Sequence, residues 1–111
     1  MGFDLQAEIE DGDVNNSTAL HLAAWEGKEA VAAQLLQAGA SVSAVNDNGS
    51  TPLHWAAYSG KSSIANLLLK ANASPTAVDK DGDTPAQYAK QRGYNELAAR
   101  LLEAEQAAAL K

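Results

Sequence analysis

The spacing of apolar and polar residues along the chain is that of short, paired helices. Residues 53–60 (LHWAAYSG) predict a helix of about two turns that ends at Gly60, because glycine can adopt the left-handed conformation that stops a helix. A second helix is predicted over residues 62–71, where Ile64, Leu67 and Leu68 lie at helical spacing. The pattern therefore predicts a helical hairpin, with Asn72 tolerating a left-handed stop at its end.

The hairpins begin and connect at recognisable sequence signals. Thr51-Pro52 and Thr84-Pro85 each place a capping hydroxyl before a proline, whose missing N–H costs nothing at the first helical position. Residues 42–50 and 75–83 are rich in Asn, Asp and Gly, and they predict turns between short extended arms. Helix pairs and turns thus alternate along the chain.

This arrangement recurs every 33 residues. Thr18, Thr51 and Thr84 differ by that step (51−18 and 84−51), as do three glycines and three leucine pairs. A period of this length predicts stacked structural units within a single domain. We expect repeats at residues 13–45, 46–78 and 79–111, the last with a C-terminal capping helix that runs past Glu103 because good helix formers continue to the end. Residues 1–12 form an acidic N-terminal segment that we expect to act as a partial cap.

The segments STALHLAA at 17–24 and STPLHWAA at 50–57 resemble the ankyrin repeat, and the resemblance covers roughly residues 13–102. It implies an all-α solenoid of stacked helix-turn-helix pairs joined by β-hairpin-like turns. The first and third units depart from the pattern, since Ala19 replaces the proline and Gln87 replaces the histidine of the central unit. End units often diverge in this way because one of their faces meets solvent.

Small and branched apolar residues account for the expected core. Alanines would let neighbouring helices approach closely, and leucines repeated at the same position would dominate stability through burial. The expected close contacts involve Ala23, Ala24, Ala56, Ala57 and Ala89, and the expected leucine ladder is Leu35, Leu68 and Leu101.

Composition narrows the possible functions. The 111 residues contain no cysteine, which excludes disulfides and thiolate metal sites. The formal charge is −6 and no basic stripe is present, so nucleic acids and anionic membranes are poor partners. The N-terminus lacks the features of a signal peptide, and no apolar run approaches the ~20 residues needed to span a bilayer. We therefore expect a soluble, cytoplasmic protein.

The acidic stretch DKDGDT at 79–84 raises the question of a calcium site. An EF-hand-like loop that began at Asp79 would need glycine at its sixth position and glutamate at its twelfth. Those positions hold Thr84 and Lys90, and the equivalent stretch of the previous repeat keeps only Asp47 as a carboxylate. We interpret DKDGDT as a turn between repeats and expect no metal or other cofactor.

The sequence predicts no catalytic residues. His21 and His54 occupy equivalent places in successive units, ~10 Å apart if the units stack, which is too far for both to bind one zinc ion. The resemblance implies instead that each histidine forms hydrogen bonds within its turn and to the adjacent unit. Neither a phosphate-binding glycine loop nor a nucleophile beside a base is present. We therefore expect a protein that is not an enzyme.

The resemblance implies that another protein binds the concave side of the solenoid. The expected contacts are the two residues before each repeated glycine and the residues at the turn tips. They are Trp25, Glu26, Val45, Asp47, Asn48, Ser50, Tyr58, Ser59, Val78, Lys80, Asp81, Asp83, Gln91 and Arg92.

Four aromatic residues divide into two classes on this view. Trp25 and Tyr58 lie one repeat apart on the expected binding face, where they either contact a partner or pack over the neighbouring turn. Trp55 and Tyr88 share the register of Leu22, and we interpret them as structural residues that face the core between helices.

Two alternatives remain open at this level. The chain is either a protein-binding module or a structural spacer from a larger array with no dedicated partner. A spacer should carry small polar residues where Trp25 and Tyr58 stand. We expect a monomer, with self-association as the alternative, because only Phe3, Leu5, Ile9 and Val14 precede Thr18 as candidates to cover the first helix pair.

Overall fold

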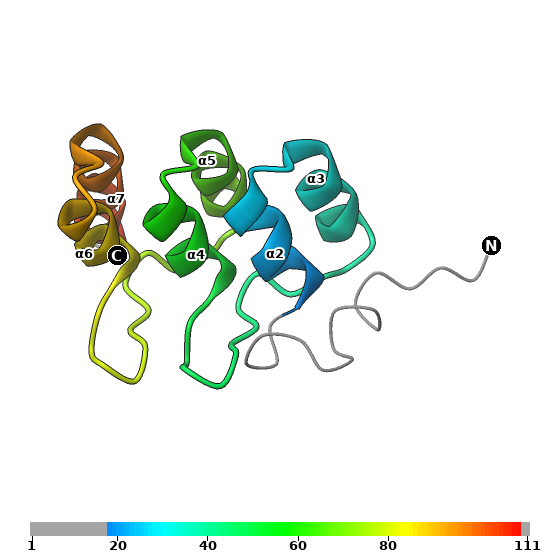
Figure 1. Ribbon diagram of the computed structural model, residues 1–111, viewed down its shortest axis with the longest axis horizontal. Helices are drawn as coiled ribbons and strands as arrows, with labels where there is room; N and C mark the ends of the chain where they lie inside the picture. Colours follow the sequence, from blue (N-terminus) through cyan, green and yellow to red (C-terminus); the bar gives the residue numbers. More distant parts are fainter. Residues whose placement is uncertain (1–17, 110–111) are drawn as a thin grey trace.

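The computed structural model describes residues 18–109, and within that range it contains six helices and no strand. The helices form three successive pairs (Figure 1). They are α2 (Ala19–Glu26) with α3 (Glu29–Gln37), α4 (Pro52–Ser59) with α5 (Ser62–Lys70), and α6 (Pro85–Gln91) with α7 (Asn95–Ala109). The prediction of an all-α solenoid of helix pairs is confirmed.

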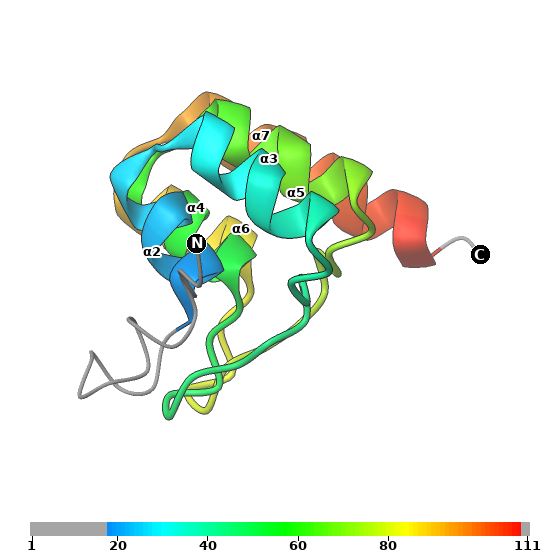
Figure 2. The same ribbon diagram turned by 90° about the vertical axis from the view of Figure 1, so that its right-hand side faces the viewer.

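The pairs stack in single file and form two layers. Helices α2, α4 and α6 lie side by side in an inner layer, and α3, α5 and α7 form a second layer behind them (Figures 1 and 2). The turns over residues 42–50 and 75–83 project away from both layers in the same direction (Figure 2). The inner helices and the projecting turns therefore form two sides of an angle, and we call the surface inside this angle the concave face.

The predicted alanines and leucines all belong to the core, together with further residues such as Leu20, Leu53 and Ile64. The alanines of α2, α4 and α6 are buried, which allows these helices to pack directly against one another. Leu68 and Leu101 are fully buried and Leu35 is nearly so. At roughly 25 cal/mol per Å² of buried apolar surface, this core stabilises helices that are too short to persist alone.

A threonine caps the start of each inner helix, as predicted for Thr51 and Thr84. The Thr51 side chain accepts a hydrogen bond from the His54 amide, and the His54 ring accepts one in return from the Thr51 amide. Thr18 and His21 form the same reciprocal pair, and Gln87 takes the part of the histidine beside Thr84. Two amides that would otherwise lack partners at each helix start are thereby satisfied.

The helix ends also agree with the sequence. Gly60 has a φ of 72°, and Asn72 has a φ of 74°. Helix α7 continues to Ala109, which confirms that it runs past Glu103. The expected N-terminal cap over residues 1–12 and the side chain of Val14 lie outside the described residues.

Candidate functional site

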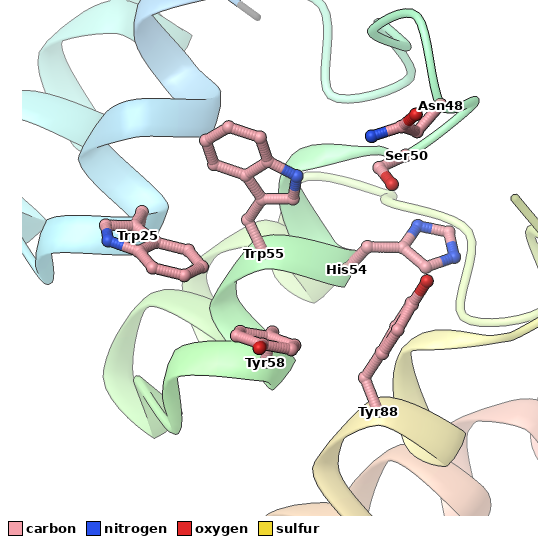
Figure 3. Close-up of a pocket in the computed structure, with 7 residues that line it drawn as sticks. All are labelled: Trp25, Asn48, Ser50, His54, Trp55, Tyr58 and Tyr88. Carbon is pink, nitrogen blue, oxygen red and sulfur yellow. The ribbon is translucent and has the colours of Figure 1, made fainter. Parts of the chain in front are cut away.

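A hollow on the concave face gathers side chains from three repeats (Figure 3). Its volume is about 240 Å³, and it opens between the inner helices and the first projecting turn. We call it the aromatic hollow, because most of its wall consists of aromatic rings. The lining residues are Trp25, Asn48, Ser50, His54, Trp55, Tyr58 and Tyr88.

The rings around the hollow contact one another in sequence from the first repeat to the second. Trp25 stacks on Tyr58, with ring centroids 5.3 Å apart and planes inclined by 18°. The ring of Trp55 meets Trp25 edge to face at 5.6 Å and 69°. The stacked pair and Trp55 therefore form walls at a steep angle to each other. Offset-stacked and edge-to-face contacts are the arrangements that aromatic quadrupoles favour.

The same chain of rings continues into the third repeat. Tyr88 meets Tyr58 edge to face, with centroids 5.9 Å apart and planes at 72°. It also meets the ring of His54 at 5.7 Å and 76°. On Tyr58 itself, the guanidinium carbon of Arg92 lies 4.5 Å from the ring centroid, which is a cation–π distance.

Hydrogen bonds within the turns hold in place the part of the hollow that Asn48 and Ser50 line. In the first turn, the side-chain oxygen of Asn46 accepts from the amides of Asn48 and Ser50 at 2.9 and 3.0 Å. The carbonyl oxygen of Asn48 accepts from the Lys80 amide at 3.0 Å, which connects this turn to the next one. The position of Asn48 beside the hollow is thus fixed from both turns.

The two histidines connect successive repeats. The Nε2 atom of His21 lies 2.7 Å from the carbonyl oxygen of Ser50, and Nε2 of His54 lies 2.9 Å from that of Asp83. Burial lowers the pKa of both rings because it penalises the charged form, although the carbonyl contacts oppose this shift. Both rings are therefore neutral structural connectors, as the resemblance implied.

Asp79 anchors the second turn and the edge of the hollow. One carboxylate oxygen accepts from the amides of Asp81 and Asp83, each at 3.0 Å, and the other accepts from the Tyr88 hydroxyl. Burial favours the neutral acid, but the hydrogen bonds outweigh burial and lower the pKa of Asp79. Burial and the bond to this carboxylate raise the pKa of the Tyr88 phenol.

The three aspartates of DKDGDT do lie close together. Their carboxylate oxygens are within 4.8 Å of one another. Asp79, however, already uses both oxygens for hydrogen bonds, and Asp81 is exposed. A calcium ion takes six to eight oxygen ligands, so the arrangement is that of a turn stabilised by its first carboxylate.

A family model for ankyrin repeats in three copies matches residues 3–79 and, in a second placement, residues 20–110. The chain belongs to the ankyrin repeat family. Ankyrin repeats are generally protein–protein interaction modules and are typically not catalytic. No curated protein matches the chain closely enough to extend this assignment. None of the helices described between residues 18 and 109 is long and apolar enough to cross a membrane.

Several residues predicted to contact a partner line the hollow of this ankyrin repeat protein, and others are exposed elsewhere. Trp25, Asn48, Ser50 and Tyr58 line the hollow, although Ser50 is itself buried. The exposed residues are Glu26, Val45, Asp47, Lys80, Asp81, Gln91 and Arg92, together with Val78, while Asp83 is half-buried.

Other predicted contacts have structural partners of their own. The Ser59 hydroxyl donates to the carbonyl oxygen of Trp55 at 2.9 Å, and it is half-buried at the helix end. Glu26 forms an ion pair with Lys28 at 3.2 Å. Trp25 packs on two rings, as one of the two alternatives from the sequence expected, and it still exposes 42 % of its surface.

The interpretation of Trp55 and Tyr88 as residues that face the core is confirmed in part. Both pack against the core, but each is only half-buried and lines the aromatic hollow. For Trp55, spacing could have revealed its place beside the hollow. Trp55 precedes Tyr58 by three positions, and residues at that spacing share a helix face. His54 also lines the hollow, which the sequence did not predict. The resemblance implied for this histidine only hydrogen bonds within its turn and to the adjacent unit.

Proposed function

We propose that the chain binds a partner protein through its concave face, with the aromatic hollow at the centre and the turn tips at the rim. The exposed apolar side chains favour this surface. Val45 and Val78 expose 57 % and 56 % of their surfaces at equivalent places on successive turns, and Trp25 exposes 42 % in the hollow wall. A protein partner would cover apolar area that otherwise remains in water.

The observation that carries the proposal is the stacked pair of Trp25 and Tyr58 with Arg92 over it. Tryptophan, tyrosine and arginine are the residues most enriched in interface hot spots. Here Trp25 and Tyr58 line a preformed hollow, and Arg92 lies over the Tyr58 ring. Because their contacts fix the rings before binding, little side-chain entropy is lost when a partner arrives. A spacer would have no use for an exposed tryptophan at this place.

Charge favours a protein over a nucleic acid as the partner. The chain has a formal charge of −6, and a surface that binds nucleic acid needs clustered bases to neutralise phosphates. The proposed activity is binding without catalysis, since both ring nitrogens of His21 and of His54 have structural contacts. We keep the division into repeats at residues 13–45, 46–78 and 79–111 for this proposal.

Site-specific cross-linking tests the proposed surface. A photoreactive amino acid at Asn48 would place the reactive group beside the hollow, and the backbone bond from Lys80 to residue 48 would remain. The matched control is the same amino acid at Leu102, which exposes 44 % of its surface on α7, in the outer layer. In extracts of the cells that produce the protein, we expect adducts that form from position 48 and not from position 102.

A substitution at the centre of the surface completes the test. Trp25→Ala should remove the position-48 adducts, while Leu102→Ala, which truncates a side chain of nearly equal exposure, should leave them intact. Thermal unfolding of each variant separates lost binding from lost folding. If position 48 yields no protein adduct, or the same adducts as position 102, the proposed binding function is wrong and the spacer interpretation is preferred.

A further inference from the structure

The aromatic hollow has a chemistry more specific than that of a general apolar contact. With a volume of about 240 Å³ it is smaller than the ~300 Å³ at which pockets for drug-sized ligands begin. That size suits one side chain of a partner better than a cofactor. Its wall contains two tryptophan and two tyrosine rings, and rings at 69° and 72° to the stacked pair present their π systems from different directions.

The turn beside the hollow contains three carboxylates, Asp79, Asp81 and Asp83, and one cation, Lys80, so its net charge is negative. Asp79 contacts the hydroxyl of Tyr88, and the carboxylate oxygens of Asp81 and Asp83 lie within 4.8 Å of those of Asp79. These carboxylates act on the lining itself, because Asp79 and Asp83 both raise the pKa of His54 against the effect of burial. Among residues 18–109, which the structure describes, no lysine or arginine lines the hollow.

The protein already contains a cation on one of these rings. The guanidinium of Arg92 lies 4.5 Å from the centroid of Tyr58, although Arg92 does not line the hollow. Aromatic faces with neighbouring carboxylates attract cations through the ring quadrupole and through Coulomb attraction. The rings of Trp55 and Tyr88, which also line the hollow, can interact with a second cation in the same way.

We infer that the aromatic hollow holds a cationic side chain, lysine or arginine, of the protein that binds the concave face. This inference rests on the proposed function and names the anchor group of the partner. Trp55 and Tyr88 form the walls that contact the cation, and Asp81 contributes the exposed charge at the rim. Arg92 acts in the opposite sense, because its guanidinium repels an incoming cation.

Small probes test this chemistry without the partner. The two tryptophans of the chain, Trp25 and Trp55, both line the hollow, so intrinsic fluorescence reports on its occupancy. Butylguanidinium and its neutral isostere butylurea are titrated into the protein at matched ionic strength, and a second pair is butylammonium and butanol. A cation–π contribution predicts that each cation binds between about 5-fold and about 30-fold more tightly than its neutral counterpart.

Two variants that change the charge beside the hollow in opposite directions sharpen the result. Asp81→Asn should weaken butylguanidinium binding about 2-fold to 3-fold, and Arg92→Gln should strengthen it by a similar factor, because the two changes shift the local potential in opposite directions. Butylurea binding should change in neither variant. Tyr88→Leu, which removes a wall, should weaken the binding of both cations.

The outcomes separate the inference from the function on which it rests. Equal binding of butylurea and butylguanidinium, or no fluorescence response to either, overturns the cationic anchor, while cross-linking from position 48 would still support a protein partner. Cation binding without any cross-linked protein would overturn the proposed function and leave the chemistry of the hollow intact. Opposite effects of Asp81→Asn and Arg92→Gln on cation binding support the cationic chemistry of the hollow, whether or not position 48 cross-links to a protein.

Discussion

The Nε2 atom of His54 lies 2.9 Å from the carbonyl oxygen of Asp83, which is 29 positions later in the chain. The other ring nitrogen, Nδ1, accepts from the amide of Thr51 at 3.0 Å. An amide can only donate, so Nδ1 carries no proton and the proton must be on Nε2, where it donates to Asp83. Only the neutral ring with its proton on Nε2 satisfies both contacts, and His21 repeats the arrangement with Thr18 and Ser50.

We predict that the protein loses stability as the pH falls below about 6.5. In the folded state, burial lowers the pKa of His21 and His54 below their ordinary value of 6.5. The unfolded chain therefore binds protons first as the pH drops. The loss begins near the unfolded pKa and continues down to the lowered folded pKa. Each histidine contributes a slope of at most about 1.4 kcal/mol per pH unit. Urea unfolding between pH 7.5 and 5 measures this loss.

A double variant is the control for this pH dependence. His21→Gln with His54→Gln removes both titrating rings and should give a flatter stability profile over that range. Asp79 does not interfere, because its pKa is lowered from 3.8 and its contribution is lost only at lower pH. A double variant with the same profile as the wild type would show that other groups cause the change.

The stability cost of replacing His54 should depend on which residue replaces it. Gln87 fills the same position beside Thr84, and its side-chain oxygen accepts from the Thr84 amide at 2.7 Å. His54→Gln should therefore keep the cap at Thr51 and lose the bond between repeats and the ring contact with Tyr88, at a cost of about 1–2 kcal/mol. His54→Ala leaves the Thr51 amide and the Asp83 carbonyl without this partner and creates a void, and we expect about 3–5 kcal/mol. Equal costs in urea unfolding would contradict this view of the histidine.

The negative charge of Asp79 should strengthen its hydrogen bond with Tyr88 more than it stabilises the turn. Asn46 occupies the equivalent place one repeat earlier and makes the same two amide contacts with an uncharged oxygen. Asp79→Asn should thus retain the turn and cost about 1–2 kcal/mol through the weaker contact with Tyr88, whereas Asp79→Ala should cost more. Tyr88→Phe should raise the pKa of Asp79, which carboxyl NMR chemical shifts can follow. An unchanged Asp79 pKa in Tyr88→Phe would mean that the hydroxyl contact is not significant in solution.

Calcium should not stabilise the fold beyond the effect of ionic strength. A cation at Asp79, Asp81 and Asp83 would have to displace hydrogen bonds that the Asp79 carboxylate already makes. Melting temperatures in calcium chloride and in sodium chloride of equal ionic strength should coincide. A clearly higher melting temperature in calcium would reveal a specific site, because a ligand of the folded state stabilises by mass action.

The sequence predicted the fold well because each signal acts locally and occurs more than once. Thr51 caps a helix through atoms three residues away, and Gly60 ends one through its own φ. The period of 33 then required these elements to stack, since no single helix pair can bury its apolar face alone. Local chemistry and repetition together determined the helices and their order.

The aromatic hollow was only partly predictable because it depends on distances between repeats. Trp25 and Tyr58 were recognised as neighbours on one face, but the role of Trp55 depends on how far the first repeat is displaced from the second. The contact between Tyr88 and Asp79 joins a helix to the preceding turn, and no periodic pattern encodes it. Side-chain contacts across repeats therefore required the three-dimensional structure.

Gly60 and Gly93 offer a matched test of packing between the second and third repeats. Both have left-handed backbones, with φ of 72° and 85°, and both follow an inner helix. A Cβ at Gly60 would lie 2.7 Å from the Tyr94 ring, whereas one at Gly93 would meet nothing within 4 Å. Gly93→Ala should cost only the left-handed strain, about 1–2 kcal/mol. Gly60→Ala should cost a further ~1–3 kcal/mol because Tyr94 must move.

A double-mutant cycle identifies the source of the additional cost. In a Tyr94→Ala background the ring is absent, so Gly60→Ala should cost no more than Gly93→Ala does in the wild type, with a coupling energy of about 1 kcal/mol or more. Urea unfolding of the four proteins gives this value, and Gly93→Ala in both backgrounds controls for general weakening of α7. Additive costs for Gly60→Ala and Tyr94→Ala would show that Gly60 is required for its backbone conformation alone. A coupling would show that close approach of the third repeat also depends on glycine at this position.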